Sequence, residues 1–300
     1  MTSTTPDAAA SVADPAEFDL EVGLASLHVY PIKSCAGIAP DEALVVETGF
    51  EFDRAWMVVG PDGRQVTQRE LPRMALIRPT LRQSDMALRA PGMLALHVAL
   101  DAVEGSTRAT VWDDEVAAFD MGALCAQWFT DFLGRELRLV RFDPDQKRLS
   151  SKRWTGDLDA ENTFADAFSM LVTSTAGLDE LNRRMAAGGH APVTMARFRP
   201  NLVLDGLDAH GEDALDEIVF ETAEGPVRLK LVKPCARCPM PDVDPETGIA
   251  GHAVGDTLAT YRADARLDGA LTFGMNAVIV EGIERALRVG MTGRARYRFD

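Results

Sequence analysis

The chain has 300 residues, of which 46% are apolar and 26% charged, and its formal net charge is -15 from 46 acidic and 31 basic residues. This composition is typical of a soluble globular protein with a large core, and the length exceeds that of a usual single domain. The negative charge repels nucleic acid and anionic membranes, and no apolar run could span a bilayer, so we expect neither as a partner.

Residues 1–22 are rich in Ala, Ser, Thr, Pro and Asp, which predicts a disordered tail. They have neither the basic start nor the apolar centre of a secretory leader. The four cysteines are too sparse for a disulfide framework, so we expect the protein in a reducing cytoplasm. Cys125 lies in a helical apolar pattern and is predicted to be an inert core thiol.

Residues 23–142 are predicted to form a β-rich domain. Short runs of alternating or β-branched residues predict strands over residues 24–30, 43–47, 54–59, 65–68, 74–81, 94–100, 107–112 and 136–142. The turn sequence Gly60-Pro61-Asp62-Gly63 predicts a hairpin. One helix is predicted over residues 122–132, ending at Gly134.

Residues 143–162 are polar and basic, and they predict a linker or loop between the two halves of the chain. Their basic side chains are Lys147, Arg148, Lys152 and Arg153. Two interpretations stay open for this segment: a solvated basic loop, or a flap that faces an anion above a site.

Residues 163–300 are predicted to form a second β-rich domain with few helices. Strands are predicted over residues 168–173, 201–205, 217–220, 227–232, 271–281 and 294–299. One helix should begin at Ser174 or Thr175, and a short helix at Asp256. Because helices and strands do not alternate, a doubly wound parallel sheet is excluded. The predicted fold is mainly β, or α+β: a β-barrel domain with covering helices, preceded by a β-rich N-terminal domain.

Cys235 and Cys238 lie three positions apart after the predicted strand 227–232, and Arg237 stands beside the second thiol. A thiolate is a soft metal ligand and a nucleophile, and a guanidinium stabilises it and binds phosphate through a forked geometry. The motif therefore predicts a site for a metal, or for a phosphorylated cofactor that carries one.

Three other interpretations of this cysteine pair stay open. A structural zinc site would need two further ligands, and a thioredoxin-like redox pair would need the N-terminus of a helix. The third is a pair of buried, inert thiols.

Basic residues elsewhere strengthen the prediction of an anion site. Arg54, Arg69 and Arg199 lie at the ends of predicted strands, and Lys33-Ser34 lies in a Gly-containing loop. Loop amides together with a lysine commonly form an anion cradle, although each arginine alone is as well explained by a surface ion pair.

Several segments, in order along the chain, resemble MOSC proteins. Residues 30–35, 53–56 and 67–72 resemble the N-terminal β-barrel domain of that family, and residues 164–166, 178–182, 197–201, 235–238 and 244–248 resemble the MOSC domain itself. Among MOSC proteins, the chain is similar to bacterial relatives of the mitochondrial amidoxime-reducing component.

This resemblance implies a molybdenum cofactor, a molybdopterin, whose metal is held by the thiolate of Cys238. The implied cofactor-binding residues are Lys33, Ser34, Arg54, Arg69, Arg199, Asn201, Arg237 and Cys238. Asp166 matches a family position and is, with Cys238, a candidate catalytic residue.

The activity that the resemblance implies is the reduction of small N-hydroxylated compounds by oxygen-atom removal. The electrons would come from a separate ferredoxin-like or flavin reductase protein. Two alternatives stay open: a carrier of the cofactor or of sulfur without turnover, and a structural β protein with an inert cysteine pair.

Overall fold

The computed structural model describes residues 18–299. The expected tail over residues 1–22 thus falls largely outside the described residues. Its last residues are not a tail, because the first strand, β1 (Leu20–Leu27), already begins at Leu20.

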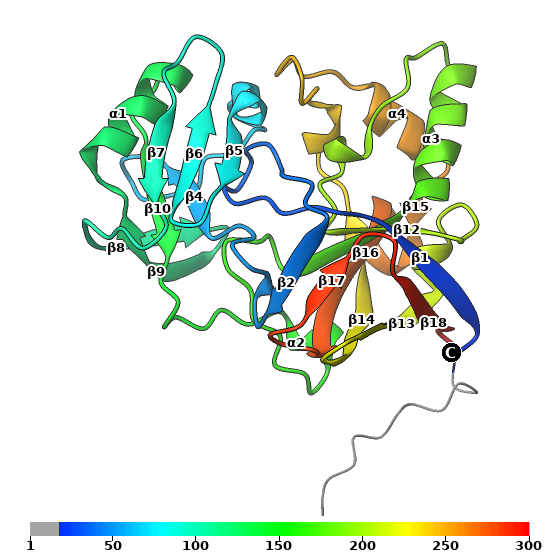
Figure 1. The fold of residues 1–300 in the computed structure, drawn as a ribbon. Coiled ribbons are helices and arrows are strands. Elements are labelled where there is room, and N and C mark those ends of the chain that lie inside the picture. Colours follow the sequence, from blue (N-terminus) through cyan, green and yellow to red (C-terminus); the bar gives the residue numbers. More distant parts are fainter. Residues whose placement is uncertain (1–17, 300) are drawn as a thin grey trace, which may run out of the picture.

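The largest sheet closes into a barrel of seven strands, on the right in Figure 1. The strands are, in order around the barrel, β11 (Met170–Ser174), β12 (Leu202–Asp205), β1, β18 (Thr292–Tyr297), β13 (Leu215–Thr222), β14 (Gly225–Ala236) and β16 (Ala270–Glu281). β16 pairs back with β11, so no strand edge is left along the barrel, and β15 (Ala263–Asp264) extends β16 at one end. The predicted β-barrel and mainly β fold are confirmed.

The hydrogen bonds do not follow the expected division between residues 23–142 and 163–300. β1 lies in the barrel, between β12 and β18, because its buried residues, Val22, Leu24 and Leu27, belong to the barrel core. In turn β17 (Ala286–Arg288) pairs with β2 (Glu42–Val46), which pairs with β3 (Gly49–Phe50). An N-terminal strand, β1, therefore belongs to the C-terminal barrel, and a C-terminal strand, β17, belongs to a sheet with the N-terminal strands β2 and β3.

Two further sheets form a separate body on the left in Figure 1, which we call the first lobe because it comes from the first half of the chain. It contains the sheet β4 (Trp56–Val59), β10 (Arg138–Phe142), β9 (Asp114–Asp120) and β8 (Gly105–Val111), and the sheet β5 (Arg78–Leu81), β6 (Asp85–Arg89) and β7 (Leu96–Ala99). Helix α1 (Gly122–Leu133) packs on β10 and buries Trp128 and Phe129. It ends, as predicted, at Gly134, whose positive φ of 72° suits a residue without a side chain.

Several elements of the first lobe differ from the prediction. The expected strand 74–81 is a 3₁₀ helix, η2 (Pro72–Leu76), followed by β5, because Pro72 fits the first turn of a helix and offers no N–H to a sheet. Residues 65–68 form only an isolated bridge, Val59 with Gln65, after the predicted turn. The strands β6 and β9, and β17 outside this lobe, were not predicted, because their runs are too short or too polar to show a period.

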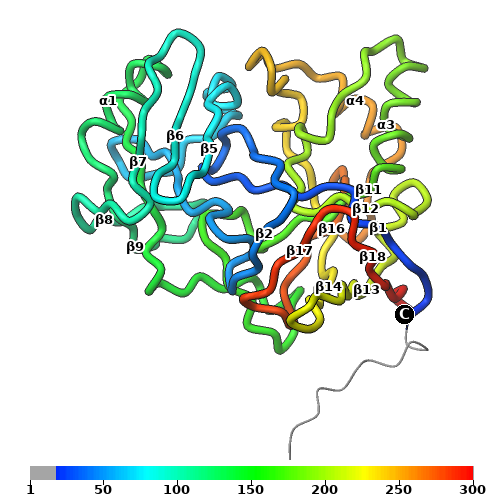
Figure 2. Tube along the Cα trace, viewed as in Figure 1, coloured from blue at the N-terminus to red at the C-terminus, as the bar shows by residue number. Residues whose placement is uncertain are grey.

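Two helices cover one end of the barrel, as Figures 1 and 2 show. α3 (Thr175–Ala187) follows Ser174, whose Oγ accepts a hydrogen bond from the Gly177 amide at 3.1 Å, so the predicted cap is confirmed. α4 (Ala253–Ala259) begins three residues earlier than Asp256.

Short helices occupy the connections. They are α2 (Lys152–Thr155), η3 (Met195–Arg197), η4 (Gly211–Ala214), η5 (Met240–Asp242) and η6 (Ala265–Leu267). Within residues 18–299 no helix is both long enough and apolar enough to cross a membrane.

Candidate functional site

One cavity brings together all the residues that the sequence predicts for the site. Its walls include Lys33, Ser34, Arg54, Arg69, Asp166, Arg199, Asn201, Arg237 and Cys238. These residues come from the loop after β1, from the first lobe, from the segments around β11 and β12, and from the end of β14. The cavity thus lies where the first lobe meets the barrel.

The cavity is strongly cationic in a chain whose net charge is -15. Five basic side chains line it, whereas the carboxylate of Asp166 is the only acidic one on its walls among the described residues. Such an excess of positive charge inside a protein is unfavourable unless an anion offsets it. The local charge therefore indicates an anionic ligand.

Contacts across the site fix the guanidinium of Arg54. Its Nη1 donates to the Asp53 carboxylate and, at 3.1 Å, to Oδ1 of Asn201, while its Nη2 donates to the Arg199 carbonyl at 3.0 Å. Asp53 is buried and also accepts a hydrogen bond from the Tyr30 amide at 2.7 Å. Arg54 thereby ties the first lobe to the barrel beside the cavity.

Arg199 and Arg237 retain buried donors without partners. Nη1 of Arg199 donates to the Cys35 carbonyl, and Nη2 of Arg237 donates to the Phe198 carbonyl at 2.9 Å. Within the described part of the chain, Nη2 of Arg199 and Nε of Arg237 have no hydrogen-bond partner although they are buried. An unsatisfied buried donor costs about 1–3 kcal/mol, which the oxygen atoms of an anion would offset. Burial, and next the neighbouring Arg54, lower the pKa of Arg199 to about 10.

Lys33 and Asp166 form an ion pair on the cavity wall. The Lys33 ammonium donates to Oδ1 of Asp166 at 2.5 Å and to the Phe164 carbonyl at 2.7 Å. The Asp166 side chain is 60% exposed, yet it lies deep among protein atoms, and this burial would by itself raise the carboxyl pKa. The Lys33 charge outweighs this effect and holds the pKa of Asp166 well below its usual range. Asp166 is therefore an ionised acceptor at neutral pH. Burial lowers the pKa of Lys33.

Asn201 lines the cavity, but its amide is already used by the protein. Its Oδ1 accepts from the Leu171 amide at 3.1 Å as well as from Arg54, and its Nδ2 donates to the His28 carbonyl at 3.2 Å. Asn201 therefore holds β11, Arg54 and the end of β1 together. The direct cofactor contact that the resemblance implies stays a prediction for Asn201, which also lines the cavity.

The four cysteines fall into two classes. Cys35 and Cys125 are buried in the apolar core of the first lobe, and burial raises the pKa of their thiols to about 12 and about 11. Cys235 and Cys238 both line the cavity. The Sγ of Cys235 accepts a hydrogen bond from Nη1 of Arg237 at 3.0 Å, whereas, among residues 18–299, no hydrogen bond engages the Sγ of Cys238. Cys238 thus offers a free sulfur beside the guanidinium.

The surroundings of this pair weaken two of the alternatives. Among the described residues, no group of three or more His, Cys, Asp and Glu side chains is placed to hold a metal ion. A zinc site at Cys235 and Cys238 would therefore lack a third and a fourth protein ligand, whereas a metal that brings ligands from its own cofactor needs only one thiolate. The pair follows β14 and precedes the 3₁₀ helix η5, unlike the helix N-terminus of a redox pair.

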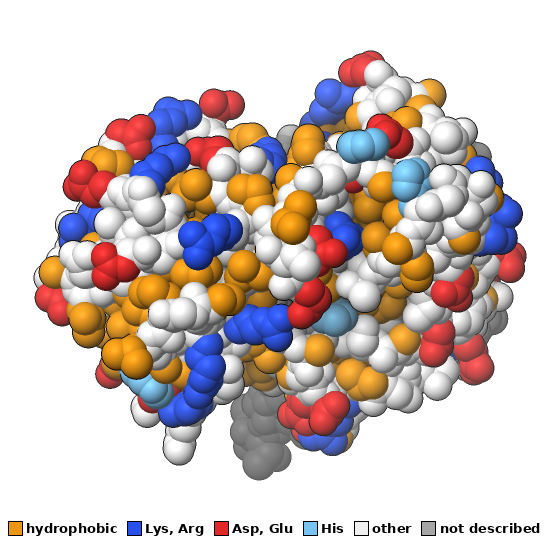
Figure 3. Space-filling view, turned by 90° about the horizontal axis from the view of Figure 1, so that it is seen from above, with side chains coloured by type: hydrophobic (Ala, Val, Ile, Leu, Met, Phe, Trp, Pro, Cys, Tyr) orange, Lys and Arg blue, Asp and Glu red, His pale blue; other side chains and the backbone are white. Residues whose placement is uncertain are grey.

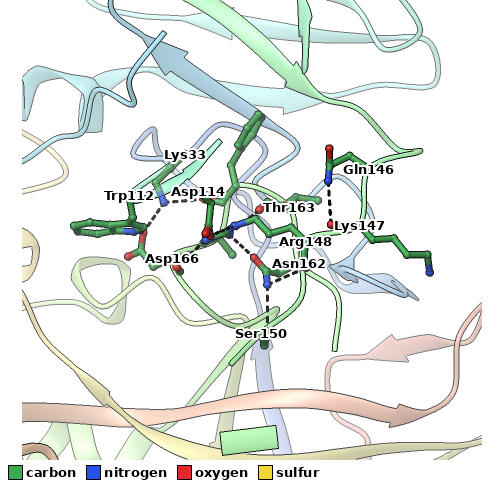
Figure 4. A network of polar contacts seen from close by, with 12 residues as sticks. Lys33, Trp112, Asp114, Gln146, Lys147, Arg148, Ser150, Asn162, Thr163 and Asp166 are labelled. Carbon is green, nitrogen blue, oxygen red and sulfur yellow. Dashed lines mark hydrogen bonds and ion pairs between the residues drawn. The ribbon is translucent and has the colours of Figure 1, made fainter. Parts of the chain in front are cut away.

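The network in Figure 4 shows a buried arginine that sequence reasoning did not place. Arg148 donates to the carbonyls of Thr163, at 3.0 Å, and Ala165, at 2.6 Å, and to the side chain of Asn162. Its Nη2 also reaches the Asp166 carbonyl at 3.2 Å. At Arg148, neither of the two interpretations of segment 143–162 holds. The side chain is buried and not solvated, and it supports the loop that carries Asp166 instead of covering the site as a flap. The sequence does not reveal this role, because these partners of Arg148 lie 14 to 18 residues further along the chain and meet it only in the folded protein.

Other wall residues were also missed. They are Thr67, Ala165, Ala167, Phe168, Met170, Leu171, Phe198, Cys235, Ala236, Met240 and Asn276. Most are apolar or small, so no chemical signal distinguishes them from core residues in the sequence. Cys235 is the exception, because it shares the motif of Cys238.

Two family models match the chain. The model of the MOSC N-terminal beta barrel domain matches residues 22–136, and that of the MOSC domain matches residues 159–292. Mitochondrial amidoxime reducing component 2 of Bos taurus is 36% identical over 253 residues, which are 81% of this chain and 73% of that protein. The Homo sapiens protein of the same name is 34% identical over 249 residues, 80% of this chain and 72% of its own. Molybdenum cofactor sulfurase of Homo sapiens is 30% identical over 254 residues, 79% of this chain but 28% of its own length.

Proposed function

The chain belongs to the MOSC family, in the branch that contains the mitochondrial amidoxime-reducing components, and from this membership we propose that it is a molybdenum-cofactor-dependent reductase of N-hydroxylated compounds. The observation that carries the proposal is the cationic cavity with two unpartnered guanidinium donors that ends at the free sulfur of Cys238.

These residues fit an anionic molybdopterin. Lys33, Arg54, Arg199 and Arg237 would hold its phosphate and pterin through charge-assisted hydrogen bonds, with Arg69 at the rim. A thiolate is the metal-binding form of cysteine, so Cys238 would bind the metal through its Sγ. When bound, the cofactor supplies two-electron oxygen-atom chemistry that no side chain of this site offers.

The net reaction breaks one N–O bond: R–NH–OH, two electrons and two protons give R–NH2 and water. Asp166, ionised at neutral pH, accepts a hydrogen bond from an N–H of the substrate and so orients the N–OH group. The Lys33 ammonium, bonded to Asp166, keeps that carboxylate in place. A separate redox protein supplies the electrons. We place the reaction in the reducing cytoplasm, which suits a chain whose four cysteines are all free.

The test is expression in a host that makes the cofactor, followed by molybdenum analysis, pterin fluorescence and an assay of benzamidoxime reduction with dithionite-reduced methyl viologen. We expect about one molybdenum per chain and turnover. Cys238→Ser should lose metal or activity, because it removes the proposed ligand. Cys125→Ala is the matched control, since Cys125 lies in the core of the first lobe. Absence of molybdenum, or equal effects of both variants, would refute the assignment.

A carrier of the cofactor or of sulfur is the second candidate, and the similarity to the human sulfurase favours it. In that case the purified protein would retain molybdenum but reduce no N-hydroxylated base with a competent donor. Cyanide-labile sulfur that disappears in Cys238→Ser would point to a persulfide on this residue.

A further inference from the structure

Trp112 stands at the tip of the hairpin that joins β8 to β9 in the first lobe. Its φ is 56°, a left-handed backbone conformation that is rare for a bulky residue and is usually taken by Gly, Asn or Asp in such a turn. The side chain nevertheless stays 40% exposed, so burial of the indole does not compensate for the strained backbone. Its contacts with the cavity residues offer the better explanation.

The indole contacts two residues of the cavity wall, one through a hydrogen bond and one through a cation–π interaction. Its Nε1 donates to Oδ1 of Asp166 at 3.1 Å, the same oxygen that receives the Lys33 ammonium. The guanidinium of Arg69 lies over the ring, 4.5 Å from its centroid. In Figure 4 the indole is next to Lys33 and Asp166, on the side away from the Arg148 network. Trp112 is thus a partly exposed aromatic residue that directly contacts two residues of the cavity wall, Asp166 and Arg69.

A role confined to packing does not explain this arrangement. A packing residue at a hairpin tip would turn toward its own sheet, whereas Trp112 reaches from the first lobe to Asp166, which precedes β11 of the barrel. Strained backbone that persists beside a site commonly serves the function of that site. Because the residue is partly exposed and its Nε1 is bonded to Asp166, a flat ligand whose N–H edge reaches Asp166 would lie within reach of the indole.

We propose that Trp112 is a specificity-determining residue that contacts the substrate and favours planar, conjugated N-hydroxylated compounds, such as aryl amidoximes, over small non-conjugated ones. This inference rests on the proposed function. An aryl amidoxime that stacks on the indole places its amino group toward the Asp166 carboxylate. Hydroxylamine has an N–OH group but no conjugated surface, so it gains nothing from the indole.

The first readout is ligand binding without turnover. Benzamidine, the reduced counterpart of benzamidoxime, is titrated into the molybdenum-loaded wild type and into Trp112→Ala, Trp112→Phe and Trp154→Ala by calorimetry. Loss of stacking in Trp112→Ala should raise Kd about 5- to 10-fold. Trp112→Phe retains a ring and should lie between the wild type and Trp112→Ala. Trp154→Ala is the matched control, because Trp154 is a half-buried tryptophan of α2 whose ring lies under the Lys233 ammonium. This variant should leave Kd unchanged.

The second readout separates specificity from general damage. For benzamidoxime, Trp112→Ala should raise KM by a similar factor, whereas KM for hydroxylamine and the molybdenum content should match the wild type. Unchanged benzamidine affinity, or no benzamidine binding to the wild type, would overturn the inference, as would equal KM changes for both substrates. If benzamidine binding depends on Trp112 but the protein shows no reductase activity, the proposed function is refuted while the role of Trp112 in ligand binding holds.

Discussion

Ser34, Arg54 and Arg199, three residues of the cavity wall, have positive φ angles of 67°, 50° and 57°. Each such conformation costs about 1–3 kcal/mol in a residue other than glycine and persists only where surrounding contacts impose it. For Arg54 those contacts are Asp53 and Asn201, and for Arg199 the Cys35 carbonyl. The guanidiniums are thus held in place before any ligand arrives, which lowers the entropy lost on binding.

Glu212 is a buried carboxyl that does not line the cavity. Ser174 donates to its Oε2 at 2.5 Å, whereas its Oε1 is buried and, within the described residues, has no partner. Burial raises its pKa from the ordinary 4.5 to about 7. Ser174 also caps α3, so the carboxyl lies under the first turn of that helix.

This pKa predicts a loss of stability as the pH rises from about 4.5 to about 7. Because the folded state favours the protonated carboxyl, the contribution of Glu212 is complete below about pH 4.5 and declines as the pH rises through about 7. Between these limits the free energy of unfolding should fall by roughly 3 kcal/mol relative to Glu212→Gln, which cannot ionise. Urea titrations at a series of pH values measure this difference. The exposed Glu51→Gln is the control, and identical pH profiles for wild type and Glu212→Gln would contradict the prediction.

Among the elements, β14 does most to place the thiols. It runs to Ala236, four residues beyond the predicted end at residue 232, and its pairing with β16 shifts register on both sides of Pro234. Proline has no N–H for the sheet, and such irregularities re-aim the residues that follow. Asn276 of β16 donates to the Lys233 carbonyl at 3.2 Å and supports this end of the strand. The local irregularity directs Cys235 and Cys238 into the cavity.

β1 is the element that joins the two ends of the chain, and a leucine pair tests its contribution. Leu27 of β1 is completely buried in the barrel core, so Leu27→Ala should lower the free energy of unfolding by about 2–5 kcal/mol. Leu124 of α1 is 72% exposed, so Leu124→Ala should change it by less than about 0.5 kcal/mol. Urea denaturation of both variants measures the effects. Similar values would show that β1 does not close the barrel in solution.

At the scale of the whole molecule, the site exists only where the first lobe and the barrel meet. Figure 3 shows basic and acidic side chains next to each other along the line between the two bodies. An exposed ion pair also joins Arg78 of β5 to Glu246, 2.6 Å apart, and such a pair contributes little to stability. The buried contacts of Arg54 and Lys33 with the barrel carry more, and both residues line the cavity.

Binding of the cofactor should therefore stabilise the whole molecule. A ligand present at about 100 times its Kd adds about 2.7 kcal/mol to the folded state. For a chain of this size that corresponds to a rise in Tm of about 5 °C or more. Calorimetry of protein from hosts with and without cofactor synthesis measures the rise, with loading checked by molybdenum content. Equal Tm values for loaded and empty protein would mean that the cofactor does not bridge the first lobe and the barrel.

The sequence by itself determined the local features of this protein. The patterns in residues 43–47 and 227–232, the cap at Ser174 and the stop at Gly134 predict their elements to within a few residues, because each signal lies close to the structure that it specifies. The motif Cys235 to Cys238 and the ordered MOSC segments pointed to the family, which the comparisons confirm. The chemistry of the site could be predicted from the sequence, because metal binding by a thiol and anion binding by a guanidinium are properties of the residue types themselves.

Only the tertiary structure decided how these parts are joined. Nothing near Leu20 indicates that β1 completes a barrel with β18, where its partner Ala295 lies 275 residues away (295 − 20), because strand pairing depends on edges left free elsewhere. The same holds for Arg148, a basic loop residue in sequence and a buried support of Asp166 in the fold, and for Trp112, whose φ and exposure are set by contacts across two bodies. Residue type specifies which interactions are possible, and long-range packing selects among them.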